Sequence, residues 1–265
     1  MSQDSRDLYL EQSEAIATIF INRPDQRNAM NFAMWHELKR LAARIEADDQ
    51  VRVLIIRGAG GNAFSAGADI AEFDRLRSNS AQARVYSEAL DGALDALWDL
   101  GKPIIAMIQG FCVGGGLELA CTADLRIAAE GSRFGIPTAK LGVLVGYREM
   151  RRLLALVGPG GMAEILLAGR ILQAEEARQL GLITRIVPPD EIEAHVNKTA
   201  EEIAQMAPLI HRWHKRIMRT VLTNPSLSNL TPEEEALPFA SFDTEDFLEG
   251  RRAFLEKRNP VFKGK

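Results

Sequence analysis

Residues 111–121 read FCVGGGLELAC and place one acidic side chain, Glu118, shortly after a glycine triplet in an otherwise apolar stretch. Glycines 114–116 allow tight backbone torsions and close approach, so the stretch predicts a helix that begins with unpaired N–H groups. Such a helix start can hold an anion. A carboxyl in its first turn, walled by Leu117 and Leu119, is expected to be partly desolvated and to exchange protons near neutral pH. The alternative is an acidic residue that only complements the helix dipole.

The composition is that of a globular protein large enough to bury a substantial core. Its 265 residues are 46% hydrophobic and 26% charged, and the formal net charge is -4, which disfavours a general nucleic-acid-binding protein. Cys112 and Cys121 lack the spacing of a disulfide framework or zinc site, and the four histidines predict no metal site. The N-terminus lacks a signal-peptide pattern, and no apolar run has the length of a membrane span. We therefore expect a cytoplasmic protein without a metal.

The hydrophobic pattern predicts alternating strands and helices up to about residue 190. An opening hairpin is expected over residues 8–21, and an amphipathic helix follows from Asn31. Two buried strands, at 51–57 and 104–110, each lead through glycines to a helix start, which could bring two backbone donors to one pocket. The other expected elements are strands in LRIAA and LITRIV, and helices over 81–99, 149–157, 160–168 and 174–180.

Beyond Pro188-Pro189 the pattern becomes wholly helical, over 190–206, 208–223, 231–239 and 243–257. This change divides the chain into an α/β core, residues 1–190, and a C-terminal helical region, residues 191–265. The last helix has an apolar stripe that needs a partner surface, and we expect that surface on another subunit. The stripe consists of Phe247, Leu248, Phe254 and Leu255.

Two common motifs are nearly matched and are disfavoured. Residues 58–63 have the G-x-G-x-x-A spacing of a dinucleotide site, but the sequence continues as a loop where the helix should begin. Residues 63–67 resemble a nucleophile elbow in which Ala63 replaces the first glycine, and the downstream histidines fall in helical patterns. A serine hydrolase therefore remains a weak alternative.

Five segments together resemble the enoyl-CoA hydratase/isomerase, or crotonase, family from end to end. They are NRPDQRNAM, AFSAGADI, QGFCVGGGLELACTADLRIA, FGIPTAKLG and FDTEDFLEGRRAFLEKRNPVFKGK, in that order. The resemblance implies an α/β fold with a crotonase-like ββα spiral core. It also implies that the C-terminal all-helical region serves oligomerisation and completes the site.

The resemblance also implies roles for particular residues. The acyl thioester carbonyl is expected between the backbone N–H groups of Ala66 and Gly115. Coenzyme A is expected to run past the two glycine-containing loops, and a C-terminal lysine, often supplied by a neighbouring subunit, is expected near its phosphates. The implied substrate-binding residues are Arg23, Ala66, Gly67, Ala68, Asp69, Ile70, Gly114, Gly115 and Lys257.

The catalytic acids depart from the family pattern. Glu118 matches the first of two glutamates that family hydratases use to activate and position water, but Thr138 stands where they carry the second. A hydroxyl can hydrogen-bond a water but cannot hold a dischargeable proton as a carboxylic acid can. Tyr147 or Glu149, in VLVGYREM, could substitute for the missing acid. The favoured alternative is that these residues form the charged start of the next helix.

We therefore predict an acyl-CoA enzyme that hydrates a 2-enoyl-CoA, or catalyses the reverse dehydration, with Glu118 as base and an enolate held by the two N–H groups. The substitution at Thr138 leaves isomerisation, decarboxylation and C–C cleavage as alternatives within the family. A non-catalytic acyl-CoA-binding protein is the alternative from another class. Coenzyme A is part of the substrate, so no separate cofactor is expected. The predicted partners are an acyl-CoA and two or five further subunits, but no nucleic acid or membrane.

Overall fold

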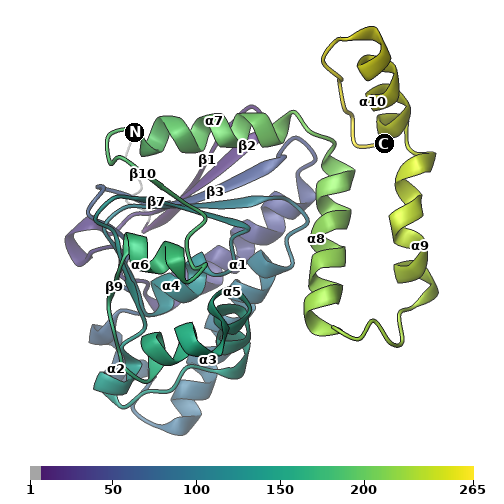
Figure 1. The fold of residues 1–265 in the computed structure, drawn as a ribbon. Helices are drawn as coiled ribbons and strands as arrows, with labels where there is room; N and C mark the ends of the chain where they lie inside the picture. The colour runs from purple at the N-terminus through teal and green to yellow at the C-terminus, as the bar shows by residue number, and fades with distance from the viewer. Residues whose placement is uncertain (1–6) are drawn as a thin grey trace.

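Two β-sheets lie at the centre of the computed structural model, which describes residues 7–265 (Figure 1). The larger sheet has the order β1 (Leu8–Ser13), β2 (Ile16–Ile21), β3 (Val53–Gly58), β5 (Ile104–Ile108), β7 (Leu125–Ala129) and β10 (Arg185–Val187). The smaller sheet has the order β4 (Ala63–Ser65), β6 (Phe111–Val113), β8 (Arg133–Gly135) and β9 (Leu172–Gln173). The strands pair in parallel except for β1 with β2 and β8 with β9.

The chain repeats one unit, in which two strands are followed by a helix. Each unit adds its first strand to the larger sheet and its second to the smaller one. The units are β3 and β4 with α2 (Phe73–Leu76) and α3 (Ser80–Trp98); β5 and β6 with α4 (Gly115–Ala120); and β7 and β8 with α5 (Tyr147–Leu166). This repetition is the ββα spiral that the family resemblance implied, so the predicted fold class is confirmed.

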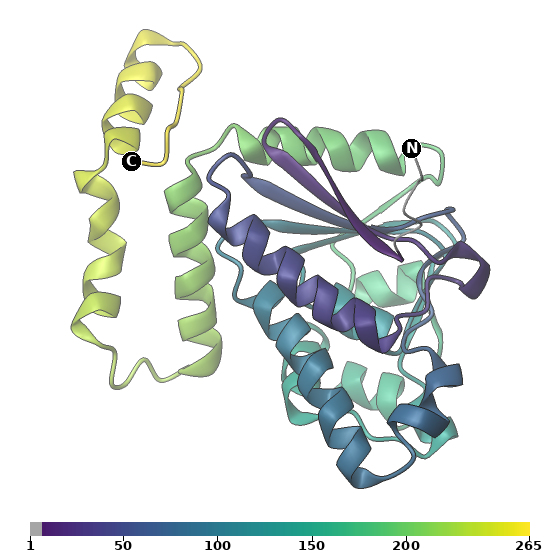
Figure 2. The same ribbon diagram turned by 180° about the vertical axis from the view of Figure 1, so that it is seen from behind.

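Helix α1 (Phe32–Ala47) packs beside α3, as the rear view shows (Figure 2). Its start is fixed by Asn31, whose side chain accepts a hydrogen bond from the Met34 N–H at 3.0 Å. Trp35 is fully buried on this helix, and its Nε1 donates to the Tyr86 hydroxyl of α3 at 3.0 Å. The predicted hairpin and this predicted helix are therefore both present.

Alternate side chains of β3 enter two different apolar cores. Leu54 and Ile56 join the core beneath α1 and α3, whereas Val53 and Ile55 join a cluster on the opposite face of the larger sheet. That second face is covered by α7 (Ile192–Ala204), which lies across the sheet (Figure 1). Helix α7 therefore belongs to the core. The sequence placed this helix in the C-terminal helical region, because the helix pattern alone does not show which surface a helix covers.

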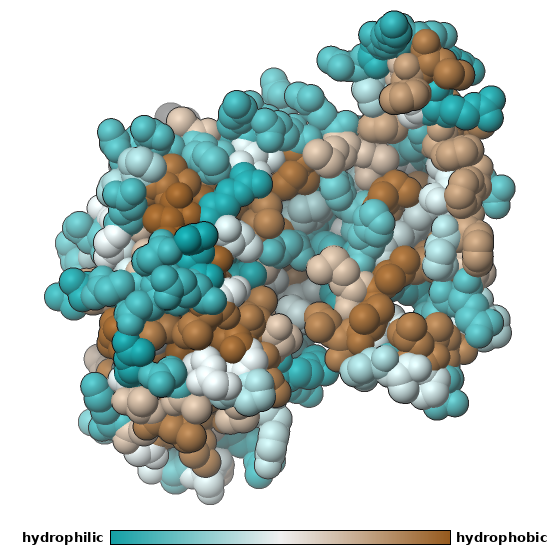
Figure 3. Space-filling view, viewed as in Figure 1, coloured by the Kyte–Doolittle hydropathy of each residue, from teal (hydrophilic) through white to brown (hydrophobic). Residues whose placement is uncertain are grey.

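The last three long helices form an arm beside the core, in the yellow-green and yellow part of the ribbon (Figures 1 and 2). They are α8 (Pro208–Thr223), α9 (Pro232–Ala240) and α10 (Glu245–Glu256). Hydrophobic residues are visible along the arm in the space-filling view (Figure 3). The exposed apolar side chains include Met218, Leu222, Phe239, Phe242, Leu248, Phe254 and Leu255. Within the described residues, none of the helices combines the length and apolarity needed to cross a bilayer.

Charged side chains connect the arm to the core. Lys215, on α8, is buried, and its Nζ donates to the Lys102 carbonyl at 2.9 Å and to Asp124 Oδ2 at 2.6 Å. Burial lowers the pKa of Lys215, and the nearby Asp124 partly opposes this shift. Because the ammonium has an acidic partner and a carbonyl partner, the buried charge is compensated.

Replacement of Lys215 should weaken the attachment of the arm. Lys215→Ala leaves the Lys102 carbonyl and the Asp124 carboxylate without this donor, so the free energy of unfolding should fall by about 3–5 kcal/mol. Urea unfolding followed by circular dichroism measures the change. Lys198→Ala, at an exposed position of α7, is the matched control and should change stability little. Equal stabilities for the two variants would contradict the assigned role of Lys215.

Candidate active site

Three loops meet at one edge of the smaller sheet. Strands β4, β6 and β8 are parallel neighbours, so the segments that follow their carboxyl ends lie side by side. The first segment carries residues 66–69, the second carries the glycine triplet and Glu118, and the third carries Thr138. The topology therefore brings together the residues that the sequence selected from three distant motifs.

The first two loops touch through their backbones at Gly67. This residue has φ 91°, which favours glycine, and a Cβ added to it would lie 2.9 Å from the Val113 carbonyl oxygen and 3.1 Å from the Gly115 nitrogen. A side chain at Gly67 would therefore force the loops apart. The close approach explains why a glycine is required between Ala66 and Ala68.

Two backbone donors are available where the loops meet, and one differs from the prediction. The Ala66 N–H donates to the Arg27 carbonyl at 2.9 Å, so the predicted role of Ala66 as an oxyanion donor is wrong. The free donor on this loop is the Ala68 N–H, 3.6 Å from where a Cβ on Gly115 would lie. Across residues 7–265, neither the Ala68 N–H nor the Gly115 N–H has a hydrogen-bond acceptor. The two groups can therefore both serve one anionic oxygen.

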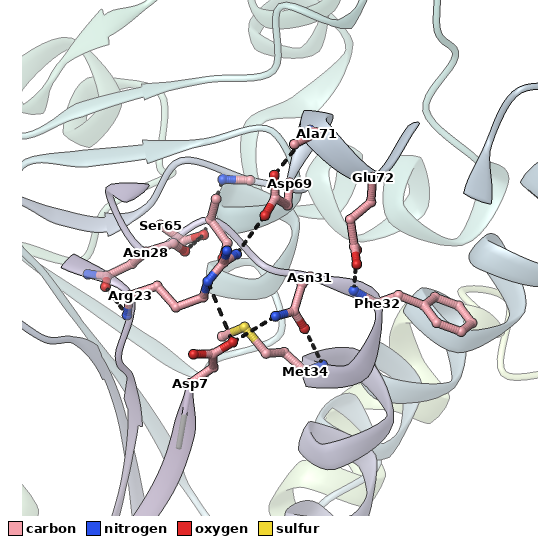
Figure 4. Close-up of polar contacts among 12 residues, drawn as sticks. Asp7, Arg23, Asn28, Asn31, Phe32, Met34, Ser65, Asp69, Ala71 and Glu72 are labelled. Carbon is pink, nitrogen blue, oxygen red and sulfur yellow. Dashed lines mark hydrogen bonds and ion pairs between the residues drawn. The ribbon is translucent and has the colours of Figure 1, made fainter. Parts of the chain in front are cut away.

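The segment after β2 holds the first loop in place (Figure 4). Arg23 Nη1 donates to the Ala29 carbonyl and to Asp69 Oδ2, both at 2.8 Å, and Asp69 Oδ1 also accepts from the Ala71 N–H at 3.1 Å. Arg23 and Asp69, which were predicted to bind coenzyme A, are thus paired with each other. Their observed contacts position the loop that presents Ala68.

Ser65 is part of the same support. Its hydroxyl is buried, donates to the Asn28 carbonyl at 2.7 Å and accepts from the Gly67 N–H at 3.1 Å. Asn28 Nδ2 in turn donates to the Ala63 carbonyl at 2.6 Å. The hydroxyl has no histidine partner among the described residues, so the serine-nucleophile alternative does not fit this site.

A cavity of about 640 Å³ opens beside the two free donors. Ala68, Gly114, Gly115, Glu118 and Thr138 line it. Its wall also includes aromatic and aliphatic side chains such as Trp35, Phe73 and Leu90, together with Asp91 and Glu149. The cavity therefore combines backbone donors for an anion, an apolar wall and several carboxyl groups.

The Glu118 carboxyl is enclosed by the protein, and this enclosure changes its pKa. Enclosure by the protein raises its pKa to about 8, mainly through desolvation, and the nearby Glu149 and Asp91 raise it further. Arg77 and Arg152 oppose this shift. Glu118 lies in the first turn of α4, as the stretch FCVGGGLELAC predicted, and it lines the cavity.

The position of Glu149 is compatible with both interpretations that the sequence allowed. It lies in the first turn of α5 and also lines the cavity. Burial and a hydrogen bond with Asp91 raise the pKa of Glu149 to about 7, while its own backbone N–H opposes the rise. The structure therefore places a second carboxyl with a near-neutral pKa in the same cavity as Glu118.

The sequence did not single out two charged residues of this region, Asp91 and Arg152. Asp91 belongs to the predicted helix 81–99, but nothing in the pattern showed that it faces a cavity. Arg152 is buried on α5, where it bonds Asp95 and lies 5.7 Å above the Trp98 ring. Its Nε and Nη1 have no acceptor in the described part of the chain.

The remaining predicted residues occupy different places. Thr138 lines the cavity at the start of a short 3-10 helix, and Tyr147 reaches its rim with a side chain that is 95% exposed. Ile70 is also exposed, just beyond Asp69. Lys257 ends α10 on the arm and does not line this cavity within one chain. The structure of one chain therefore does not test the predicted contact between Lys257 and coenzyme A.

The raised pKa of Glu118 should make stability depend on pH. The folded protein keeps this proton between the ordinary value of 4.5 and about 8, so the penalty for ionising Glu118 grows as pH rises through that window. Glu118→Gln should therefore be more stable than wild type above about pH 8, by about 2–5 kcal/mol, and the difference should vanish at acidic pH. Urea unfolding across this range measures it. A pH-independent difference, or the same trend in Glu164→Gln on exposed α5 surface, would contradict the assignment.

Comparisons with known proteins agree with this architecture. The family model for enoyl-CoA hydratase/isomerase matches residues 11–265. The chain is 35% identical over 256 residues to a protein of Syntrophomonas wolfei named crotonyl-CoA hydratase, covering 97% of each. It is 32% identical to the carnitinyl-CoA dehydratase of Escherichia coli K12, covering 98% of this chain and 100% of that one.

A solved structure described as an enoyl-CoA hydratase/carnithine racemase from Magnetospirillum magneticum superposes with a TM-score of 0.94. It shares 43% sequence identity, and the match covers 100% of this chain and 97% of the other. An enoyl-CoA hydratase structure from Bacillus anthracis gives a TM-score of 0.92 at 32% identity, with 98% and 100% coverage. With its ββα spiral and paired glycine loops, the chain belongs to the enoyl-CoA hydratase/isomerase family.

Proposed function

We propose that this protein adds water across the C2–C3 double bond of a 2-enoyl-CoA and catalyses the reverse dehydration of a 3-hydroxyacyl-CoA. One observation carries the proposal: the free N–H groups of Ala68 and Gly115 converge beside Glu118, whose pKa is about 8. Hydration of an enoyl thioester needs a held oxyanion and proton transfer at the acyl chain. This arrangement offers both.

The backbone donors act on the thioester oxygen. As oxygen adds to C3, the electron pair of the double bond moves through C2 onto the thioester oxygen and forms an enolate. The fixed N–H groups of Ala68 and Gly115 stabilise that negative charge without reorganising. By analogy with other oxyanion holes, each such donor contributes about 2.7–4 kcal/mol to lowering the barrier.

The cavity wall suits an acyl chain that leads away from these donors. Trp35, Phe73 and Leu90 provide apolar contacts. The coenzyme A portion of the substrate would pass the surface of the loop at Gly67–Ile70 and the glycine triplet at Gly114. In an oligomer, Lys257 of a neighbouring subunit would approach its phosphates. Coenzyme A enters as part of the substrate, and the proposed reaction needs no other cofactor.

A 3-hydroxyacyl-CoA with a polar or cationic acyl chain is a second candidate substrate. The cavity carries Asp91 and Glu149 at its acidic side, and acidic groups near aromatic rings favour cations. One relative is named for carnitinyl-CoA dehydration. This candidate uses the same bond changes as the first and differs only in what the acyl end carries.

Turnover of an acyl-CoA panel tests the reaction. Purified protein should add the mass of one water to crotonyl-CoA or a longer 2-enoyl-CoA, and Glu118→Gln should lower kcat by at least about 100-fold. Mass spectrometry separates this reaction from decarboxylation, which loses carbon dioxide, and from isomerisation, which leaves the mass unchanged. Glu164→Gln is the matched control. Hydration that persists in Glu118→Gln would refute the role of Glu118, and binding without turnover would refute the proposed reaction.

The arm supports a proposed homotrimer or dimer of trimers, because its apolar side chains need a covering surface. Light scattering should give a mass of three or six chains. Phe254 is 83% exposed on α10, so Phe254→Glu should shift the distribution towards smaller species. Lys198→Glu, at an exposed position of α7, is the control. A monomeric wild type at micromolar concentration would overturn the proposed assembly.

A further inference from the structure

Hydration moves two protons, one from the water and one to C2, and Thr138 cannot serve as the second carboxyl. Another group in the cavity must do so if the function proposed above is right. Among the described residues that line the cavity, the carboxyl groups are those of Glu118, Asp91 and Glu149. The choice therefore lies between Asp91 and Glu149, and the contacts around them decide it.

The backbone before α5 lets the Glu149 carboxyl turn back over the start of its helix. A Cβ added to Gly146 would lie 2.5 Å from Glu149 Oε2, so the absence of a side chain at Gly146 leaves room for the carboxyl in this position. The backbone N–H of Glu149 itself, one of the donors left free at a helix start, partly opposes the rise in the pKa of its carboxyl. These contacts fix the Glu149 carboxyl at the cavity wall rather than in solvent, and only 6% of the residue is exposed.

Asp91 approaches Glu149 from the neighbouring helix α3. Asp91 raises the pKa of Glu149, as a second carboxyl that can share a proton with it is expected to do. Glu149 Oε2 and Asp91 Oδ1 are both buried, and neither atom has an N–H or O–H donor within residues 7–265. A proton held by Glu149 and donated towards Asp91 satisfies this contact. The pair can therefore hold one proton between its two carboxyl groups and release it again.

We propose that Glu149 is the second proton-transfer residue of this enzyme, that it accepts the proton of the attacking water, and that Asp91 positions it. This inference rests on the proposed hydration. It relocates the second carboxyl from the loop after β8, where Thr138 stands, to the first turn of α5.

The proton and electron movements balance within this assignment. Ionised Glu149 takes a proton from water as the water oxygen bonds to C3, and the π electrons of C2–C3 move onto the thioester oxygen. The protonated Glu149 then donates its hydrogen bond to Asp91. Protonated Glu118 gives its proton to C2 as the enolate electrons return to form the C2–H bond. Exchange of one proton with solvent restores both carboxyl groups, and no oxidant or reductant is involved.

The surrounding charges favour this division of roles. Glu149 is approached by Asp91 of α3 and by Arg152 of its own helix, while Glu118 lies across the cavity. Arg148 and Asp95 form an ion pair on the adjoining surface, and Arg77 acts on Glu118. Burial raises the pKa of both carboxyl groups towards neutrality, to about 8 for Glu118 and to about 7 for Glu149, so each can exchange a proton near neutral pH. In the proposed division of roles, Glu118 gives its proton to C2 in hydration and takes it back in dehydration.

Three variants test the assignment through crotonyl-CoA hydration. Glu149→Gln should lower kcat by at least about 100-fold and change KM by less than about threefold, because it removes proton transfer and keeps the shape. Glu149→Asp should recover part of kcat. Glu164→Gln, farther along α5, should match wild type. Binding of butyryl-CoA, measured by calorimetry, should be unchanged in every variant, which also shows that each one folds.

The pH profile tests the positioning role of Asp91. Hydration by wild type should rise through about pH 7, as Glu149 ionises, and fall above about pH 8, as Glu118 ionises. Asp91→Asn offers an amide donor that favours ionised Glu149, so the rising limb should move to lower pH. A loss of kcat without this shift would mean that Asp91 is only structural and would overturn its assigned role.

The outcomes separate this inference from the proposed function. If wild type hydrates crotonyl-CoA and the kcat of Glu149→Gln lies within threefold of the wild-type value, the role of Glu149 is overturned and the proposed hydration stands. A loss of activity in Glu149→Gln that is confined to acyl chains carrying a cation also overturns this role, because Glu149 would then be a substrate-binding residue. Wild type that binds butyryl-CoA but hydrates no 2-enoyl-CoA overturns the proposed function, and this inference with it.

Discussion

The contact between the two glycine loops at Gly67 is the constraint on which the site depends. With no side chain between them, the loop after β4 lies against the backbone at Val113 and Gly115. That proximity directs two free N–H groups, from different turns of the spiral, towards one point. The segment after β2 then fixes the arrangement through Arg23 and the buried Asn28. Positioning of the proposed oxyanion site is thus a property of backbone packing, supported by polar side chains that need not touch a substrate.

Electrostatic strain accompanies this arrangement. The enclosure that gives Glu118 a pKa near neutrality also makes its ionised form costly, and Glu149 adds a second carboxyl to the same cavity. Arg152 lowers the cost, but two of its own nitrogens lack acceptors in the described chain. This cluster of buried charged groups lowers the stability of the folded protein. It is understandable where proton exchange at neutral pH is the purpose, since active sites commonly retain destabilising groups.

The sequence was informative where periodicity or a motif extends over many residues. It predicted the opening hairpin, α1, α3 and the helix start that carries Glu118. It missed β4, β6 and β8, because three-residue strands leave no readable period. The error at Ala66 has the same origin: whether an N–H is free depends on the Arg27 carbonyl, which belongs to a separate segment. Likewise, Asp91 lay on a predicted helix, but only packing reveals which cavity it faces.

The way the arm is attached affects how freely the amino-acid sequences of the arm and the core can change. Arg52, in the core, donates to the carbonyl oxygen of Phe262, and Arg219, on the arm, donates to those of Asp99 and Leu100. Every residue type carries such an acceptor, so these bonds place little restriction on the side chains at the accepting positions. The arm is therefore joined to the core largely by main-chain acceptors, and its outer surface can be redesigned, for instance to change subunit contacts, with little effect on the attachment.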